Sequence, residues 1–171
     1  MKKGTLIIFS GLPGSGKSTL ASQLASYLKA MYLRIDTVEQ GLKDICGISD
    51  VQGMGYRLSY RIAQDNLHLG ITVIADSVNP WTLTRDEWNK VATDVGANFI
   101  NVEVTCSNQS EHKDRLENRT TNIPGLKNPK WEDVLQRDYQ PWISERIQLE
   151  TAGKSIEESF QELLAALGKA L

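Results

Sequence analysis

The stretch Thr5-Leu6-Ile7-Ile8-Phe9-Ser10-Gly11-Leu12-Pro13-Gly14-Ser15-Gly16-Lys17-Ser18-Thr19 decides the fold. It contains the pattern G-x-x-x-x-G-K-S/T between a short β-branched and aromatic strand and a helix-forming segment, which is the context that a phosphate-binding loop requires. The glycines permit positive φ values, so that successive backbone N–H groups point inward toward an anion at a helix N-terminus. The stretch therefore predicts a strand, a phosphate-binding loop (P-loop) and a helix in succession.

Within this loop, nine consecutive residues are candidate nucleotide contacts: Gly11, Leu12, Pro13, Gly14, Ser15, Gly16, Lys17, Ser18 and Thr19. Lys17 is expected to reach the β- and γ-phosphates, and the Ser18 hydroxyl to complete a Mg²⁺ shell. The alternative is a Gly/Ser-rich turn that happens to contain a lysine. The strand before the motif and the helix after it favour the nucleotide site.

Length, charge and cysteine content place only a few limits on function. A chain of 171 residues has the length of one domain, 1–171, and its formal net charge of −2 argues against binding long nucleic acid by charge alone. Cys46 and Cys106 lie far apart without metal-ligand spacing, which favours a reduced chain. The apolar run after Met1-Lys2-Lys3 is too short for a signal peptide or a membrane span. We expect a cytoplasmic protein.

The rest of the chain alternates between strand-like and helix-like segments. The expected strands are 5–10, 32–35, 71–75, 99–105 and 146–151. The expected helices are 17–30, 37–44, 56–69, 82–95, 109–119, 131–139 and 155–171. In helix 82–95 the candidate buried residues are Leu83, Trp88, Val91 and Val95. This order predicts an α/β fold of three layers, a five-stranded parallel sheet with helices on both faces, in which ligands bind at the carboxyl ends of the strands.

Two aspartates follow expected strands at that edge. Asp36 could accept the proton of an attacking hydroxyl or hold it in line with the γ-phosphate, or it could cap a helix beginning at Thr37. Asp76 could help to bind Mg²⁺, or form a turn leading into Asn79-Pro80. The sequence leaves both pairs of alternatives open and favours the functional one.

Arg115 and Arg119 are separated by four residues in the charged segment 109–119, so both lie on one helical face. Guanidiniums suit the charge that develops during phosphoryl transfer, and a mobile segment could bring them in on closure. A solvated helix with a Glu111–Arg115 pair is equally compatible with the sequence. Arg119 is the stronger candidate, because it stands at the start of the Pro- and Gly-containing loop 120–129.

Other candidates have no clear function from sequence. Arg57 and Arg61 share a helical face that could meet an anionic substrate or solvent. His68 and His112 lack partner spacing and are expected at the surface. The aromatic residues Tyr32, Trp131, Tyr139 and Trp142 are expected to pack in the core or at hinges rather than to stack on bases.

These features occur together in one known group: the segment 11–19, Arg34-Ile35-Asp36-Thr37, Ile74-Ala75-Asp76-Ser77-Val78-Asn79-Pro80, Arg115 with Arg119, and Trp131-Glu132-Asp133-Val134-Leu135. Over nearly its whole length the chain resembles the small P-loop kinases of the AAA-type ATP-binding group. That group includes the kinase domain of phage 5′-hydroxyl polynucleotide kinase, chloramphenicol phosphotransferase, gluconate kinase and adenylylsulfate kinase.

The resemblance implies ATP as donor, Mg²⁺ as cofactor and a hydroxyl as acceptor. It implies that Asp36 activates the acceptor, that Asp76 stands at the Walker B position, and that Arg115 or Arg119 lies in a small lid of approximately residues 108–130. It also implies that residues around Gly153 and Lys154 border the adenine. Ile35 and Thr37 flank Asp36 where the polynucleotide kinases have an extra basic residue, which weakens a nucleic-acid acceptor.

The leading hypothesis is therefore an ATP-dependent phosphotransferase that acts on a hydroxyl of a small molecule. The alternatives are a 5′-hydroxyl polynucleotide kinase, with nucleic acid only as a 5′-end substrate, and an ATPase switch module that acts on a protein partner. Nothing in the sequence indicates membrane association, and nothing in it names the acceptor.

Overall fold

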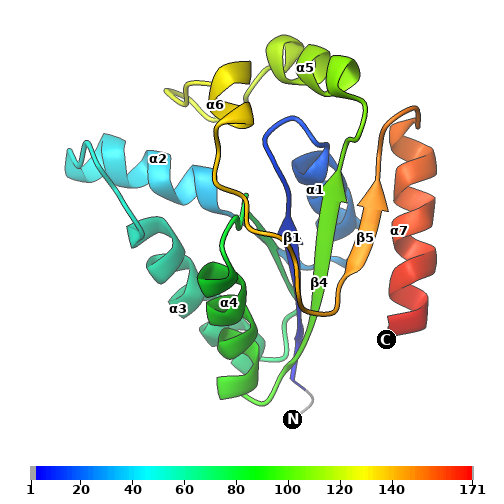
Figure 1. Ribbon diagram of the computed structural model, residues 1–171. Coiled ribbons are helices and arrows are strands. Elements are labelled where there is room, and N and C mark those ends of the chain that lie inside the picture. The colour runs from blue at the N-terminus through cyan, green and yellow to red at the C-terminus, as the bar shows by residue number, and fades with distance from the viewer. Residues whose placement is uncertain (1–2, 171) are drawn as a thin grey trace.

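The computed structural model describes residues 3–170, in which five parallel strands form one sheet in the order β2-β3-β1-β4-β5 (Figure 1). The strands are β1 (Thr5–Ser10), β2 (Met31–Arg34), β3 (Val73–Asp76), β4 (Asn98–Thr105) and β5 (Ile147–Glu150). All four pairings are parallel, and β1 lies at the centre with Phe9 beside Asp76 on one side and Val102 on the other. The predicted five-stranded parallel sheet is confirmed.

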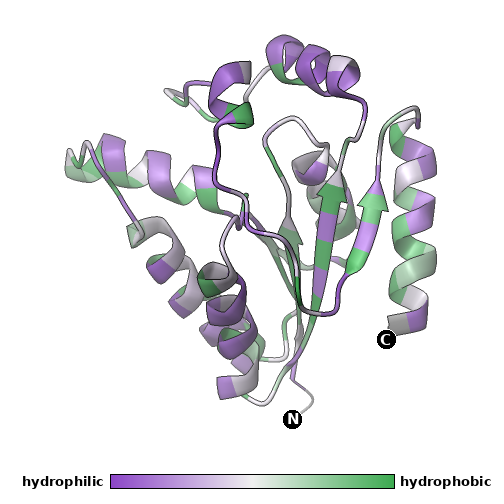
Figure 2. Cartoon of the chain, in the orientation of Figure 1, coloured by the Kyte–Doolittle hydropathy of each residue, from purple (hydrophilic) through white to green (hydrophobic). Residues whose placement is uncertain are grey.

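Helices cover both faces of this sheet because the side chains of β1 alternate between them. Ile7 and Phe9 face the helices α1 and α7, whereas Leu6 and Ile8 face α2, α3 and α4. These helices are α1 (Lys17–Leu28), α2 (Ile35–Cys46), α3 (Met54–His68), α4 (Thr82–Asp94) and α7 (Ile156–Ala170). In Figure 2 the strands carry green bands, whereas the helices α4 and α5 are largely purple.

Two further helices, α5 (Gln109–Asn118) and α6 (Trp131–Leu135), lie beyond the carboxyl ends of the strands (Figure 1). The segment between them, 119–130, has no helix or strand, as expected. Among residues 3–170, every helix is too short or too polar to cross a lipid bilayer. The carboxyl edge of the sheet is therefore covered by α5, α6 and the segment that joins them.

Several sequence-based boundaries were wrong in detail. The helix after β2 begins at Ile35 with Arg34 as its N-cap, so Asp36 does not cap it. The helix α6 ends at Leu135 rather than at Tyr139.

Leu83 is 68 % exposed rather than buried, because it stands on the outer side of the first turn of α4. Ser155 and Glu158 form a capping box at the start of α7, since the side chain of each accepts from the backbone N–H of the other.

A buried arginine holds the loop after β3 against the segment after α6. Arg85 is 2 % exposed, and its guanidinium lies 4.2 Å from the centre of the Trp142 ring. Its nitrogens donate hydrogen bonds of 2.8–3.2 Å to four backbone carbonyls, those of Asn79, Pro80, Gln140 and Pro141. The loop that follows Asp76 is thereby fixed to a part of the chain more than 50 residues away.

We expect Arg85→Lys to lower the free energy of unfolding by about 2–4 kcal/mol, because a lysine cannot reach four carbonyls and leaves buried acceptors without donors. Urea denaturation would measure this change in the free energy of unfolding. The exposed Arg61→Lys is the matched control and should change stability by less than about 0.5 kcal/mol. Equal denaturation midpoints for the two variants would contradict the assigned role of Arg85.

Candidate active site

The P-loop connects β1 to α1 and has the backbone that its glycines predict. Gly14 and Gly16 have φ values of +89° and +95°, in the left-handed region that favours glycine. The Ser15 N–H donates to the Leu12 carbonyl at 3.2 Å, which closes a turn inside the loop. The loop ends at Gly16, the N-cap of α1, so the first N–H groups of that helix are directed at the space above the loop.

Lys17, the first residue of α1, brings a positive charge to the two cavities at the P-loop. The residue is only 5 % exposed, and within residues 3–170 no carboxylate forms an ion pair with its ammonium. A largely enclosed ammonium without an ion pair favours the binding of an anion. The next residue, Ser18, is half-buried on the same turn. The arrangement therefore suits a bound phosphate.

Two cavities meet at this lysine. The first, which we call the P-loop cavity, measures about 460 Å³ and is lined by residues that include Gly14, Gly16, Lys17, Ser18, Thr19, Tyr32, Arg34, Arg115, Arg119, Thr151 and Lys154. The second, which we call the side cavity, measures about 1060 Å³ and lies against α2, α3 and α4. Lys17 and Arg119 line both. A group held by Lys17 is therefore accessible from either cavity.

Asp76 ends β3 beside the P-loop and is 2 % exposed. Its Oδ2 accepts a 2.7 Å hydrogen bond from the Tyr32 hydroxyl and lies 3.9 Å from Arg34 Nε. Burial, and next the charge of Asp76, raise the pKa of Tyr32. The phenol therefore stays protonated and donates its hydrogen bond to Asp76. Tyr32 therefore has a polar function at this edge of the sheet, beyond the packing role expected from sequence.

The other carboxylate oxygen of Asp76, Oδ1, is buried and has no hydrogen-bond partner among residues 3–170. A free carboxylate oxygen near the hydroxyl-bearing first turn of α1 fits Mg²⁺, which takes oxygen ligands. Within the described part of the chain, no three His, Cys, Asp or Glu side chains gather into a metal cluster. The residues thus fit an ion held largely by phosphate oxygens and water, as at a nucleotide site.

Asp36 lies in the first turn of α2 and lines the side cavity together with Glu39. Burial, and next the negative charge of Asp36, raise the pKa of Glu39. Sequence reasoning did not single out Glu39, although its spacing of three residues from Asp36 places both on one helical face. The side cavity therefore presents a half-buried carboxylate, Asp36, next to Glu39, an acid that is harder to ionise.

The two candidate arginines of α5 have different surroundings. Arg115 donates to the Thr151 hydroxyl at 2.9 Å and to the Thr151 carbonyl at 3.0 Å, and it pairs with Glu111 as the alternative reading expected. Arg119 ends α5, donates to Asn128 at 2.8 Å and reaches both cavities. Burial lowers the pKa of Arg119 and the charge of Asp36 opposes that shift, while a guanidinium stays protonated at neutral pH. The structure brings Arg119, not Arg115, to the junction of the cavities.

His112 is not a surface residue, contrary to expectation. It is 6 % exposed, its Nε2 lies 2.8 Å from the Pro13 carbonyl oxygen, and the Trp131 ring packs edge-on against it at 5.2 Å. The other histidine, His68, is exposed as expected. Sequence spacing gave no signal for His112, because its partner is a backbone atom of a distant loop.

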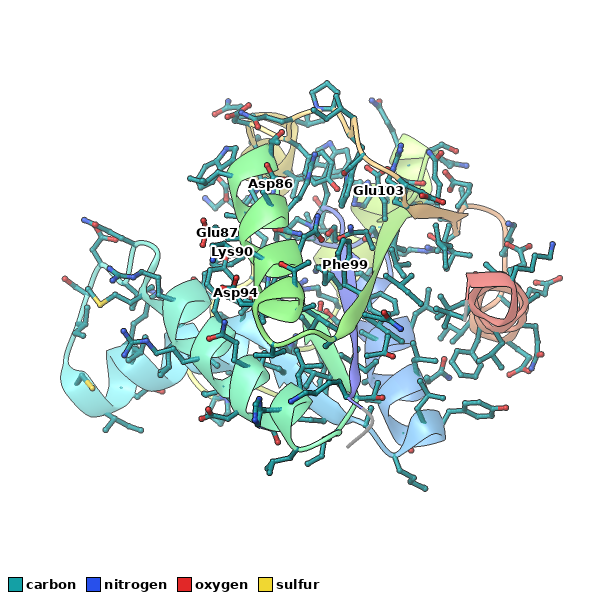
Figure 3. All side chains as sticks on the ribbon, turned by 90° about the horizontal axis from the view of Figure 1, so that it is seen from below. Asp86, Glu87, Lys90, Asp94, Phe99 and Glu103 are labelled. Carbon is teal, nitrogen blue, oxygen red and sulfur yellow. The ribbon has the colours of Figure 1, made fainter. Side chains whose placement is uncertain are left out.

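The side cavity extends from Asp36 down the groove between α3 and α4. Arg57 and Arg61, left unassigned by the sequence, line its α3 wall. On α4, Glu87, Lys90 and Asp94 lie along the side toward α3 (Figure 3). Aromatic surface is supplied by three further lining residues, Tyr56, Tyr60 and Trp81.

The comparisons with known proteins agree with this geometry. A family model described as an AAA domain matches residues 6–137. The chain belongs to this family. A probable adenylyl-sulfate kinase of Aeropyrum pernix is 24 % identical over 95 % of this chain and 92 % of its own length. The adenylyl-sulfate kinase of Oceanobacillus iheyensis is 28 % identical over 95 % of this chain and 83 % of its own.

Among solved structures, the APS kinase of Mycobacterium tuberculosis in complex with AMPPNP and APS shares the fold, with a TM-score of 0.71, 23 % identity and coverage of 98 % of this chain and 99 % of that one. The resemblance to small P-loop kinases is thus confirmed. The chain is an ATP-dependent kinase, in line with the kinase names of these relatives and the ATP analogue AMPPNP in that solved structure.

We expect Lys17→Met to weaken Mg·ATP binding about tenfold or more, because the bonds from a buried ammonium to phosphate are lost. The melting temperature of the nucleotide-free protein should not fall, since within residues 3–170 the ammonium forms no ion pair that the variant would break. Calorimetric titration and thermal denaturation would measure these effects, with the exposed Lys43→Met as control. Wild-type affinity for Mg·ATP in Lys17→Met would contradict the site.

Proposed function

We propose that this kinase transfers the γ-phosphate of ATP to a hydroxyl group of a small molecule bound in the side cavity. The observation that carries the proposal is that Lys17 and Arg119 line both cavities. A γ-phosphate held by Lys17 from the P-loop cavity would then face an acceptor in the side cavity. Asp36 lines only the side cavity of the two, where the acceptor hydroxyl would lie.

In this proposal the loop residues 11–19 hold the phosphates, with Lys17 between the β- and γ-phosphates. Ser18 and the free Oδ1 of Asp76 would hold Mg²⁺, directly or through water. When bound, Mg²⁺ offsets negative charge on the β- and γ-phosphate oxygens. Tyr32 keeps the Asp76 carboxylate oriented by its 2.7 Å hydrogen bond.

Asp36 would orient the acceptor hydroxyl and take its proton as the hydroxyl oxygen bonds to the γ-phosphorus. The bond between that phosphorus and the bridging β–γ oxygen breaks, and ADP leaves with the electron pair. Arg119 would stabilise the charge on the oxygens of the transferring group. Arg115 keeps its contacts with Glu111 and Thr151 at the edge of the P-loop cavity.

The side cavity favours an acceptor that carries negative charge and a planar ring. Seven cationic side chains line it, against the four acidic residues Asp36, Glu39, Glu87 and Asp94. The seven are Lys17, Arg57, Arg61, Lys90, Arg119, Lys127 and Arg137. Tyr56, Tyr60 and Trp81 offer aromatic faces. Because relatives are named adenylyl-sulfate kinases, adenylyl sulfate is the first acceptor to test.

The test is an acceptor screen in which ADP formation is measured above the background of ATP hydrolysis. The panel contains adenylyl sulfate, nucleosides, sugars, antibiotics and a 5′-hydroxyl oligonucleotide. We expect a small anionic hydroxyl compound to raise ADP formation, with phosphate recovered on the acceptor. Stimulation by a protein partner alone would instead support an ATPase switch.

Asp36→Asn should lower turnover of the acceptor found in that screen by about 100-fold or more, because an amide cannot take the hydroxyl proton. Mg·ATP affinity should stay within about twofold of wild type, since Asp36 lies outside the P-loop cavity. The exposed Asp65→Asn is the control. A parallel loss of ATP affinity would place Asp36 in the nucleotide site instead.

Arg119→Ala should reduce turnover by about 100-fold while changing Mg·ATP affinity far less, because the guanidinium acts on charge that develops during transfer. Steady-state kinetics would separate kcat from the KM for ATP. Lys113→Ala, on the same helix, is the control. A larger effect on KM than on kcat would assign Arg119 to ground-state nucleotide binding.

A further inference from the structure

We infer that His112 and Thr151 are positioning residues of the P-loop. Each holds one outward-facing carbonyl of the loop, and each thereby turns the next backbone N–H toward the phosphate. Both lie far from the motif in sequence, by 99 residues for His112 and Pro13 and by 136 for Thr151 and Ser15. The inference rests on the proposed binding of ATP phosphates by residues 11–19 and is independent of the acceptor.

His112 holds the Pro13 carbonyl. The two atoms, His112 Nε2 and Pro13 O, lie 2.8 Å apart in a buried contact. A carbonyl oxygen can only accept, so Nε2 must carry the proton, which fixes the tautomer of the ring. The ring cannot swing away, because Trp131 packs edge-on against it. A Cβ built on Gly14 would lie 3.0 Å from His112 Cδ2, so the histidine sits directly on the loop.

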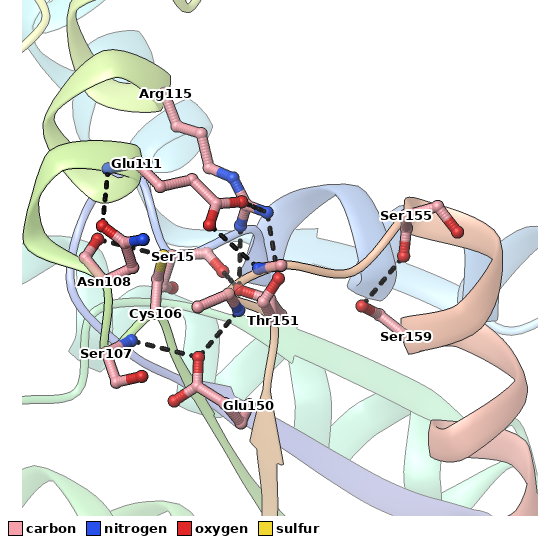
Figure 4. Close-up of polar contacts among 12 residues, drawn as sticks. Ser15, Cys106, Ser107, Asn108, Glu111, Arg115, Glu150, Thr151, Ser155 and Ser159 are labelled. Carbon is pink, nitrogen blue, oxygen red and sulfur yellow. Dashed lines mark hydrogen bonds and ion pairs between the residues drawn. The ribbon is translucent and has the colours of Figure 1, made fainter.

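Thr151 holds the Ser15 carbonyl. Its hydroxyl oxygen lies 2.9 Å from Ser15 O and 2.9 Å from Thr105 O, and it accepts from Arg115 Nη1 (Figure 4). The Thr105 carbonyl already accepts the backbone N–H of Thr151 at 2.9 Å. The single hydroxyl proton is therefore needed at Ser15 O. Arg115 occupies a lone pair of the hydroxyl and so orients that proton toward the loop.

Because the peptide group is planar, these two contacts also fix the direction of two backbone N–H groups at the anion site. In a trans peptide the C=O and the following N–H point in opposite directions. With the Pro13 and Ser15 carbonyls held outward, the N–H groups of Gly14 and Gly16 face the other way, into the loop. The intervening Ser15 N–H is already used by Leu12 O. Gly14 and Gly16 are thus two loop amides left for phosphate, beside the first N–H groups of α1, and each has one external anchor.

The test uses pairs of variants that remove or keep the donor at nearly constant shape. His112→Phe and Thr151→Val lose the hydrogen-bond donor, whereas His112→Gln and Thr151→Ser keep one. The exposed residues His68 and Thr93 give the matched controls His68→Phe and Thr93→Val. Mg·ADP is the probe, titrated by calorimetry, and thermal denaturation reports on folding.

We expect each donor-less variant to bind Mg·ADP about tenfold more weakly, because an unpaired carbonyl lets its peptide group turn and removes an oriented donor. The donor-keeping variants should bind within about threefold of wild type, and the controls without change. Amide NMR adds a direct readout: Mg·ADP should shift the Gly14 and Gly16 signals in wild type, and less in the variant that frees each peptide.

A donor-less variant that melts earlier but binds Mg·ADP within twofold of wild type would overturn the inference, because the contact would then be only structural. If His112→Phe does not fold, the Thr151→Val and Thr151→Ser pair decides in the same way. Failure of every acceptor in the screen would leave these binding results unchanged. The two proposals therefore fail separately.

Discussion

The charge of Lys17 is the constraint on which this site depends. The residue is 5 % exposed at the start of α1, and its ammonium has no carboxylate partner in the described chain, so the site favours an anion beside it. Both cavities open onto this charge, one from the P-loop and one from α2, α3 and α4. The central position of β1 puts the lysine there, because the loop leaves the middle of the carboxyl edge with β3 and Asp76 beside it.

The parts of this site that could be predicted from sequence are those that local pattern determines. The P-loop follows from a fixed spacing of Gly, Lys and Ser, and the buried strands from continuous apolar runs, so both were found. Tertiary contacts set the rest. Ile35, not Thr37, begins α2, because Ile35 is buried against Leu33 and Ala75 in the core below the sheet. His112 forms a hydrogen bond with a backbone carbonyl, and a partner of that kind leaves no pattern of side chains in the sequence.

The donor side and the acceptor side are built in different ways. The proposed donor contacts come mainly from one continuous stretch, residues 11–19, so the motif alone predicts a nucleotide donor. The side cavity takes residues from α2, α3, α4 and the segment 119–137, which are far apart along the chain. Charged and aromatic residues in those segments are also common on ordinary helix surfaces. Arg57 and Tyr60 are distinguished from other helix-surface side chains only because they line the same cavity as Asp36.

The helix α5, which lies next to the P-loop, is anchored and cannot move away as a whole. His112 ties α5 to Pro13, and Arg115 ties the same helix to Thr151, which in turn holds Ser15. A helix attached at two points on one face cannot rotate away without breaking both. Any closing movement over the phosphates must therefore begin after residue 118, where α5 ends and the backbone of Arg119 becomes extended. Arg119 stands at that point and lines both cavities, and its hydrogen bonds run to Asn128 rather than back to α5. In the proposed mechanism, the residue that acts on the transferred phosphate is therefore held by the segment 119–130 and not by the anchored helix.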